Sequence, residues 1–451
     1  MSIKESGHHF VAIFGGAVAG AEAGHLLANR GFRVVVFEQS LLPYGKIEDG
    51  LPKWHSKLRN KEENNIDEKI NHPNIRFVPG VKLGRDVDFE DLLQWGFTAI
   101  ILATGAWKDR PLPIDGIDDF IDKGLYYQNT FVYWFNHNHE PNHIAPAMEI
   151  KDNAIIIGGG LASLDVAKII MFETVQKALK NLGIETDLFT LDHGINKVLE
   201  KHDLTLKDLG LNGCTLYYRR RAMDMPLSPM PTDTQEKLEK AQMVRQKILD
   251  NFKRKYLFKF EPCCIPVGKL IENNRLSGIR FQRTKIDNNR VIPIENDFIE
   301  VNSPLVISSI GSIPEMIKGI PSDGSVFKIT DQESCLIDGF DNVFAVGNAV
   351  TGKGNINESV LHGRKITEEI MDHHLDWHQE DYENWHRQTA VNVGSDIHKI
   401  IETNEKKQFL SDEVIQFIMD KTEALQKKAG FDGDYESWVK QNTPPRLEDM
   451  I

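Results

Sequence analysis

Two stretches of the chain share one pattern, in which a short apolar run passes through glycines into an amphipathic segment. The first covers residues 9–40, with apolar runs at 10–14 and 34–37 and the glycine turn "GGAVAG" at 15–20. Short apolar runs bounded by glycine are typical of buried parallel strands, and the longer mixed segment between them is typical of a helix. The pattern predicts a strand, a tight turn, a helix and a second strand.

This order suits the binding of a dinucleotide. The turn lets backbone N–H groups and the helix N-terminus face a pyrophosphate, while an acid after the second strand accepts from a ribose hydroxyl. Glu38 is that acid, 23 positions after Gly15, and Ala17 adds a methyl group where the usual fingerprint has glycine. The predicted contacts are Gly15, Gly16, Ala17, Gly20 and Glu38. The alternative is a glycine-rich turn that binds no ligand.

The second stretch, residues 153–171, repeats the pattern. Its apolar run meets three glycines and continues into a helix-like segment. Two cradles in one chain need two nucleotides, which selects enzymes that hold a flavin dinucleotide and a nicotinamide dinucleotide together. The predicted contacts here are Gly158, Gly160, Leu161, Ala162 and Ser163.

The strand expected after the second cradle is delayed by a polar, partly helical excursion at 172–213. It then appears as "CTLYYRRR" at 214–221, with arginine where the first unit has its acid. A guanidinium can bind a 2′-phosphate that an acid would repel, so we expect Arg219 and Arg220 to bind NADPH and Arg221 to lie in solvent. The first cradle is left for FAD. The alternative is a solvated turn with ordinary surface arginines.

The composition narrows the class of protein. The chain has 451 residues and a formal charge of −13, which opposes nonspecific nucleic-acid binding, and no stretch approaches the roughly 18 apolar residues of a membrane span. Its four cysteines show no C-x-x-C spacing, and its N-terminus has no signal-peptide pattern. We expect a soluble, multi-domain, cytoplasmic protein.

Several histidines and cysteines are candidates for chemical sites. The histidines at 137, 139 and 143 and at 373, 374 and 378 lack the cysteines or H-E-x-x-H pattern that would support a metal site, and we expect exposed polar side chains. Adjacent Cys263 and Cys264 are interpreted as packed thiols. We predict no metal site and no catalytic side chain.

Six motifs together resemble a known family. They are "VAIFGGAVAG", "PYGKIEDGLP" (43–52), "VKLGRDVDFEDLL" (81–93), "AIILATGA" (99–106), "GGGLASLDVAK" (158–168) and "GNAVTGKGNINESVLHGR" (347–364). Their order resembles that of the adrenodoxin reductase-like and glutamate synthase small-subunit-like flavoenzymes, which include ferredoxin–NADP reductases. The excursion at 172–213 resembles the first branch, and "YRRRAMDMP" resembles the second.

The resemblance implies further FAD contacts. Gly45 would let the backbone pass near the flavin, and Val81 would contact the adenine. The remaining residues are the crossover Ala103, Thr104 and Gly105, the ribityl-phosphate contacts Gly347 and Asn348, and the start of a flavin-facing helix at Gly354, Asn355 and Ile356. In the loop after Gly45 the family usually has apolar residues and an Arg-Tyr, so Lys46, Glu48 and Asp49 make this environment more charged.

The resemblance also implies an architecture and an activity. We expect an α/β fold with two Rossmann-like domains, the NADP domain inserted into the FAD domain, and a C-terminal helical extension. The expected boundaries are 1–112 and 305–371 for the FAD domain, 113–304 for the NADPH domain and 372–451 for the extension.

The expected function is transfer of electrons from NADPH through FAD to an iron–sulfur protein such as ferredoxin. The alternatives are an electron-input subunit of a glutamate synthase-type enzyme, and a non-catalytic nucleotide-binding protein. Because the FAD strand starts within the first residues, without a cysteine-rich iron–sulfur region, the free-standing reductase is favoured.

Overall fold

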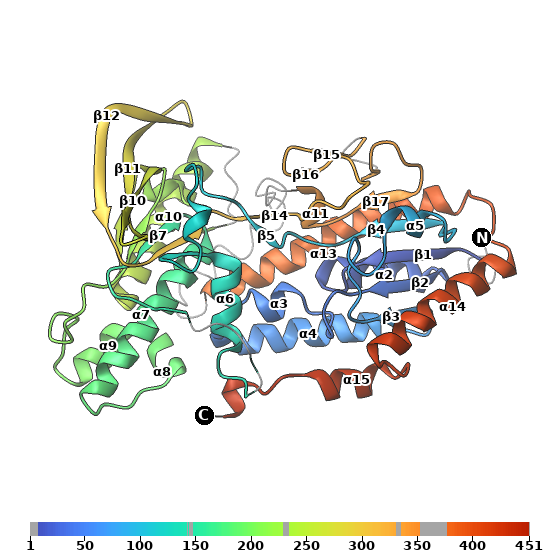
Figure 1. Ribbon diagram of the computed structural model, residues 1–451, viewed down its shortest axis with the longest axis horizontal. Helices are drawn as coiled ribbons and strands as arrows, with labels where there is room; N and C mark the ends of the chain where they lie inside the picture. Colours follow the sequence, from blue (N-terminus) through green and yellow to red (C-terminus); the bar gives the residue numbers. More distant parts are fainter. Residues whose placement is uncertain are drawn as a thin grey trace.

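A five-stranded parallel sheet forms the centre of the first unit in the computed structural model (Figure 1). The structure describes residues 8–351 and 377–450, except 142, 144–147, 229–233 and 331–334. The strand order is β17-β4-β1-β2-β3. The strands are β1 (Phe10–Phe14), β2 (Arg33–Phe37), β3 (Ile75–Val78), β4 (Ala99–Leu102) and β17 (Val343–Ala345).

The residues of β1 alternate between two hydrophobic cores. Val11 and Ile13 pack on the face covered by α2, α4, α13 and α15, whereas Ala12 packs on the face covered by α5 and α14. Helices therefore cover both faces, which explains why these strands are apolar throughout. The helices are α2 (Val18–Asn29), α4 (Ser56–Ile70), α5 (Phe89–Leu93), α13 (Trp377–Asn404), α14 (Asp412–Ala429) and α15 (Tyr435–Asn442).

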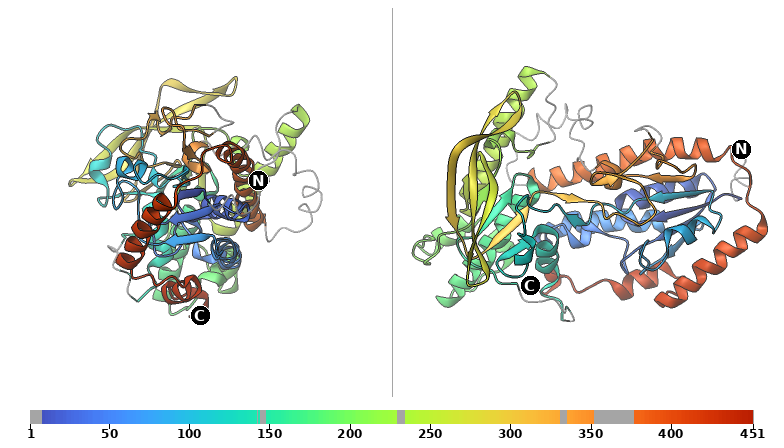
Figure 2. Two further views of the ribbon diagram at one scale, coloured as in Figure 1. Left: turned by 90° about the vertical axis from the view of Figure 1, so that its right-hand side faces the viewer. Right: turned by 45° about the horizontal axis from the view of Figure 1, so that its top comes forward.

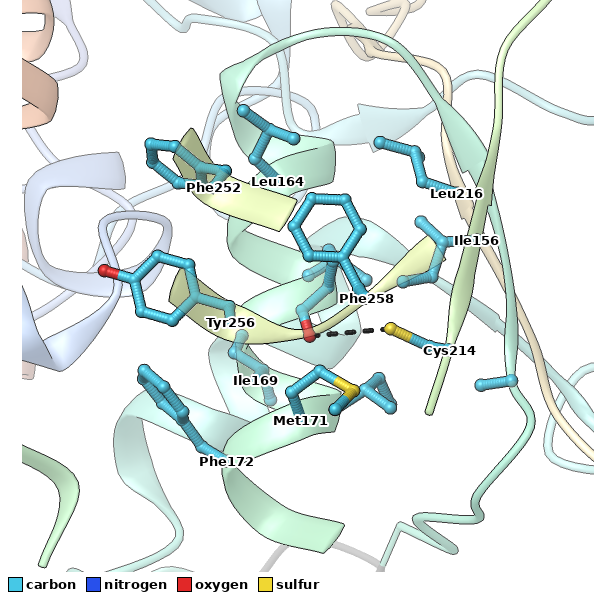
Figure 3. Packing of buried hydrophobic residues seen from close by; sticks show 14 of the residues in the cluster. Ile156, Leu164, Ile169, Met171, Phe172, Cys214, Leu216, Phe252, Tyr256 and Phe258 are labelled. Carbon is cyan, nitrogen blue, oxygen red and sulfur yellow. Dashed lines mark hydrogen bonds between the residues drawn. The ribbon is translucent and has the colours of Figure 1, made fainter. Parts of the chain in front are cut away.

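A second parallel sheet, in the order β6-β13-β7-β8-β9, lies beside the first along the long axis of the molecule (Figure 1). Its strands are β6 (Leu125–Tyr127), β7 (Ile155–Gly158), β8 (Thr215–Tyr217), β9 (Lys259–Glu261) and β13 (Val306–Ser309). Helices cover one face: α6 (Gln128–His137), α7 (Leu161–Asn181), α8 (Leu188–Asp192), α9 (Ile195–Lys201) and α10 (Gln235–Tyr256). In this core the Cys214 thiol lies 3.7 Å from the Ala167 carbonyl oxygen. Phe258 and Met171 belong to the same cluster of buried side chains (Figure 3).

An antiparallel sheet covers the other face of this second sheet. It forms an outer layer at the edge of the molecule (Figure 2), and its Phe281 stacks on Tyr217 of β8 with ring centroids 4.3 Å apart. Its strands are β10 (Cys264–Glu272), β11 (Arg275–Asp287) and β12 (Arg290–Asn302). Smaller elements complete the described chain: α3 (Lys46–Asp49), α11 (Asn348–Thr351), β5 (Lys108–Asp109), β14 (Ser312–Ile313), β15 (Ser322–Asp323), β16 (Val326–Phe327), and the 3-10 turns Lys53–His55, Asp118–Phe120, Ala222–Asp224 and Leu447–Asp449.

The second sheet is inserted into the first. The chain leaves the first sheet after β4, builds the second, and returns to add β17 beside β4. The outgoing segment β5 pairs with the returning segment β14, where Asp109 lies opposite Ser312. The predicted α/β class with one Rossmann-like unit inserted into another is therefore confirmed. After the long excursion at 172–213, β8 does pair in parallel with β7.

The C-terminal helices cover the first unit, as Figure 1 shows for α13, α14 and α15. Tyr435 donates a hydrogen bond of 2.7 Å to Asp67, and the Trp438 ring N–H donates one of 2.7 Å to the Leu41 carbonyl. Among the described helices, none combines the length and apolar character needed to cross a bilayer.

Arg446 fastens the end of the chain to α3 and α4. Its guanidinium donates to Glu48 at 2.6 Å and to Glu63 at 2.8 Å, and its side chain is 12% exposed. Arg59 pairs with Glu63 on one side and with Glu448 on the other. Two neighbouring acidic side chains are therefore held by two largely buried cations, of which Arg446 binds both acids and Arg59 pairs with Glu63.

Replacing Arg446 by methionine should destabilise the protein strongly. Loss of the cation leaves Glu48 and Glu63 buried with incomplete compensation, which costs about 3 kcal/mol. Urea unfolding is the measurement, and Arg30→Met is the matched control, because Arg30 binds Glu405 at 2.6 Å but is 54% exposed. That exposed pair should contribute at most about 1 kcal/mol. Equal effects of the two substitutions would contradict the role given to Arg446.

Candidate functional site: two nucleotide cradles

The glycines after β1 allow three backbone segments to meet. A Cβ atom at Gly15 would lie 2.4 Å from the Ala103 carbonyl oxygen, and one at Gly20 would lie 1.7 Å from the Gly15 carbonyl oxygen. Only glycine fits such an approach. Helix α2 then starts from Ala17, which offers no side-chain cap, and has no acid in its first turn. The first N–H groups of the helix therefore face this turn without a side-chain acceptor, as anion binding requires.

Glu38 closes the first cradle. Its buried carboxylate accepts from the Gly16 N–H at 2.7 Å and from the Ser40 N–H at 3.0 Å. Burial raises the pKa of Glu38 to about 7, and these two hydrogen bonds oppose the shift. Val81 donates its N–H to the Glu38 carbonyl at 2.7 Å. The structure thus brings together the predicted ribose and adenine contacts.

Other predicted FAD contacts lie at the same edge of the sheet, because β1, β2, β4 and β17 are parallel. Ala103, Thr104 and Gly105 follow β4, and Gly347 and Asn348 follow β17. The buried Thr104 hydroxyl has no hydrogen-bond partner in the part of the chain that is described. A Cβ at Gly45 would lie 2.9 Å from the Ala17 methyl, so this loop also reaches the cradle. Gly354, Asn355 and Ile356 lie outside the described residues.

These features fit a bound FAD. The glycine turn and uncapped α2 would hold its pyrophosphate, and Glu38 would accept from its ribose. The unpaired Thr104 hydroxyl is an additional polar group that a ligand could satisfy.

The second cradle differs in how its three glycines are used. A Cβ at Gly158 would lie 2.5 Å from the Ser309 carbonyl oxygen, and one at Gly159 would lie 2.1 Å from the Tyr218 ring. A Cβ at Gly160 would meet nothing within 4 Å. The first two glycines therefore permit internal packing, and the open surface for a ligand is at Gly160.

Helix α7 begins at this open position. Gly160 precedes it without a side-chain cap, and the first turn contains no acid. Ser163 turns back, because its hydroxyl donates to the Gly160 carbonyl at 2.6 Å, while Leu161 and Ala162 are the first helical residues. By contrast, Thr234 caps α10 with its side chain. The start of α7 is thus suited to a pyrophosphate.

The three arginines after β8 have different surroundings. Arg219 is exposed, and Arg220 donates from one terminal nitrogen to the Asn289 carbonyl at 3.1 Å and from the other to the Asn289 side-chain oxygen. Arg221 was predicted to lie in solvent; its side chain is about half exposed but forms two hydrogen bonds, of 2.9 and 3.0 Å, to Asp224. Asp224 and Asn289 were not predicted as site residues. Asp224 lies within the quoted "YRRRAMDMP" run, where the interpretation rested on the arginines, and Asn289 belongs to no quoted motif.

A polar cluster joins the two units where β5 pairs with β14. The Lys46 ammonium donates to the Asn129 side chain at 2.9 Å and to the Ser312 hydroxyl at 3.1 Å. Asn129 also donates to the Trp107 carbonyl at 2.8 Å, and its N–H donates to Asp109 at 3.2 Å. Burial lowers the pKa of Lys46 to about 8 and raises the pKa of Asp109 to about 6. The charged loop after Gly45 thus contributes Lys46 to a polar contact between the two units.

The prediction that the histidines at 137, 139 and 143 are exposed is wrong, because His137 is buried and His139 and His143 are half-buried. The His137 ring lies 3.1 Å from Asp49 and 2.5 Å from Glu140. Burial opposes the charged ring, but these two carboxylates outweigh it and raise the pKa of His137 to about 9. Glu48, His137 and Glu140 have candidate metal-ligand atoms within 4.8 Å of one another. Since Arg446 already binds Glu48, we assign no metal there. His373 and His374 lie outside the described residues.

Comparisons with known proteins agree with this geometry. Residues 9–205 match the family model described as pyridine nucleotide-disulphide oxidoreductase. The chain is 24% identical over 330 residues to the mitochondrial NADPH:adrenodoxin oxidoreductase of Arabidopsis thaliana. The aligned region covers 66% of each protein. It is 31% identical over 174 residues to a probable ferredoxin/ferredoxin–NADP reductase of Mycobacterium tuberculosis, covering 38% of this chain and 29% of that protein.

A solved structure shows the same fold over most of the chain. FprA of Mycobacterium tuberculosis in complex with NADPH superposes with a TM-score of 0.61, at 20% identity, over 93% of this chain and 91% of its own. This superposition shows the fold. The sequence matches confirm the predicted resemblance to adrenodoxin reductase-like flavoenzymes, and they support the predicted class of NAD(P)H-dependent flavoprotein reductase. All four cysteines lie in the described part of the chain, and none of them forms a disulfide bond there.

The buried Glu38 carboxylate should make the stability of the FAD-free protein depend on pH. Because its pKa in the folded state is about 7, against 4.5 as the ordinary value, the folded protein binds more protons between these pH values than the unfolded chain. Stability should therefore fall as pH rises from about 4.5 to about 7, by up to about 3 kcal/mol. Urea unfolding at pH 5 and pH 8 measures this. Glu38→Gln should flatten the difference, and an unchanged difference would contradict the assignment.

Replacing Gly160 by alanine should separate binding from folding. The added methyl meets no protein atom, and the backbone there is extended (φ −97°), so thermal stability should be close to that of the wild type. The same methyl would crowd a phosphate at the start of α7, and we expect NADPH to bind at least about tenfold more weakly. Gly159→Ala is the contrasting variant, since its methyl would collide with Tyr218. Unchanged NADPH binding by Gly160→Ala would show that the coenzyme does not use this cradle.

Proposed function

We propose that the protein is an FAD-containing reductase that oxidises NADPH and passes electrons singly to an iron–sulfur protein such as a ferredoxin. One observation carries this proposal: a single chain builds two glycine cradles, each at the carboxyl edge of its own parallel sheet and each at an uncapped helix start. This arrangement suits two dinucleotides. The names of the mitochondrial and mycobacterial relatives support the choice of donor and acceptor.

The chain's own part in this reaction is to bind and orient the two dinucleotides. NADPH gives up two electrons as a hydride, and an iron–sulfur cluster accepts one; a flavin supplies the chemistry that bridges this difference. The residues around the first cradle hold the FAD, and those around Gly160 hold the coenzyme. Hydride transfer requires no acid or base side chain, so the proposal names no catalytic residue.

The coenzyme preference follows from the groups after β2 and β8. Glu38 after β2 suits a ribose with free hydroxyl groups, while Arg219 and Arg220 after β8 suit a 2′-phosphate. We assign residues 1–112 and 305–371 to the FAD domain and 113–304 to the NADPH domain. We place the protein in the cytoplasm, because the four cysteines form no disulfide bond among the described residues and a reducing compartment keeps cysteines in that state.

An anaerobic titration tests the proposal directly. NADPH should bleach the yellow colour of the FAD-loaded protein at much lower concentration than NADH, because only NADPH carries the phosphate that the arginines bind. With NADPH present, cytochrome c reduction should then rise strongly when ferredoxin is added.

Each failure has its own meaning. A flavin that NADPH does not bleach would indicate a non-catalytic nucleotide-binding protein. Equal rates with and without ferredoxin would refute the acceptor. Gly160→Ala serves as the control for coenzyme binding in the same cuvette.

A further inference from the structure

The antiparallel sheet holds the backbone of the arginine segment. Three consecutive carbonyls, those of Tyr218, Arg219 and Arg220, each accept a hydrogen bond from this sheet or from the turn leading into it. The donors are the Cys264 N–H at 2.9 Å, the Thr284 hydroxyl at 2.9 Å and the Cys263 N–H at 3.1 Å. The path of the segment after β8 is therefore fixed by residues about 40 to 70 positions later in the chain, not by local turn preference alone.

The tip of the β11–β12 hairpin reaches the side chain of Arg220. Asn288 and Asn289 form this tip, both with left-handed backbone angles (φ 45° and 61°), which asparagine tolerates well. Asn289 accepts from Arg220 through its backbone carbonyl and through its side-chain oxygen. The Arg220 Nε lies 3.9 Å from Asp224.

This arrangement leaves particular donors available. Asn289 uses one N–H on each terminal nitrogen of Arg220, and a guanidinium has five N–H donors in all. The exposed Arg219 side chain forms no hydrogen bond or ion pair with any described residue. One arginine is thus held in a fixed orientation beside one that is free to move.

We propose that Asn289 is a positioning residue for the 2′-phosphate of the coenzyme. By binding Arg220 from the hairpin tip, it fixes that guanidinium beside Arg219, so that the remaining donors of both can bind one phosphate. The inference rests on the proposed function, because it assumes that the second cradle takes NADPH. It also gives the antiparallel sheet a role in coenzyme choice, since a preorganised guanidinium loses less side-chain entropy on binding.

Binding of nucleotide fragments to the full-length, FAD-loaded protein tests this role without turnover. Adenosine 2′,5′-bisphosphate carries the 2′-phosphate, and adenosine 5′-monophosphate lacks it. Asn289→Gly removes the side-chain acceptor and keeps a residue that adopts left-handed angles. In isothermal titration calorimetry, this substitution should weaken binding of the bisphosphate about three- to tenfold and leave the affinity for the monophosphate unchanged.

Asn288→Gly is the matched control, because it is the same substitution in the same turn at a residue with the same handedness. It should change neither affinity. In an Arg220→Ala background, Asn289→Gly should have no further effect, because its action passes through Arg220.

The outcomes separate this inference from the proposed function. A wild type that does not prefer the bisphosphate refutes NADPH selection and the role of Asn289 together. If the wild type prefers the bisphosphate and Asn289→Gly binds it with the same affinity as the wild type, only the role of Asn289 is refuted. Equal weakening of both ligands, or an undiminished effect of Asn289→Gly in the Arg220→Ala background, would likewise overturn the positioning role.

Discussion

The close approach of backbone segments at the two glycine turns is the constraint on which the rest of the structure depends. Because Gly20 has no Cβ, α2 can begin against the Gly15 carbonyl, and Gly158 lets the turn after β7 approach Ser309 in the same way. Each helix therefore starts directly at the carboxyl edge of its sheet, with its first N–H groups uncapped by a side chain. Every other predicted cofactor contact among the described residues matters only because it lies at or reaches one of these edges.

The sequence was sufficient for the cradles because their pattern is local. Within about 30 residues, an apolar run, a glycine turn and a helix define each unit, and the parallel-strand rule then places Glu38 beside Gly16. The arginine strand was also recognised after its long delay, because β8 keeps the apolar character of a buried strand. What composition predicted wrongly was His137: the polar run around it indicated exposure, but its partner Asp49 comes from the other unit, 88 positions earlier.

The remaining site features depend on contacts between distant parts of the chain. Lys46 binds Ser312 across 266 positions, and Arg446 binds Glu48 across 398. No spacing rule connects such residues. The sequence showed a charged loop where relatives have apolar residues, but only the fold shows that Lys46 faces the junction of the two units while Glu48 receives the end of the chain. The different surroundings of Arg219 and Arg220 likewise depend on a hairpin about 70 positions further on.

Although the chain is acidic overall, several of its basic side chains are buried where separate elements of the fold meet. Lys168 of the cradle helix α7, 2% exposed, binds Asp192 of α8 at 2.7 Å and so connects these two helices of the second unit. Desolvating such a pair offsets much of its attraction, so these contacts add little net stability compared with apolar packing. Removing one partner is nevertheless costly, because the other charge is left buried. The hydrophobic cores therefore supply most of the stability, and Trp54 extends apolar packing from the first unit into the core of the second. The largely buried cations Lys46 and Arg446 add specific contacts between distant parts of the chain.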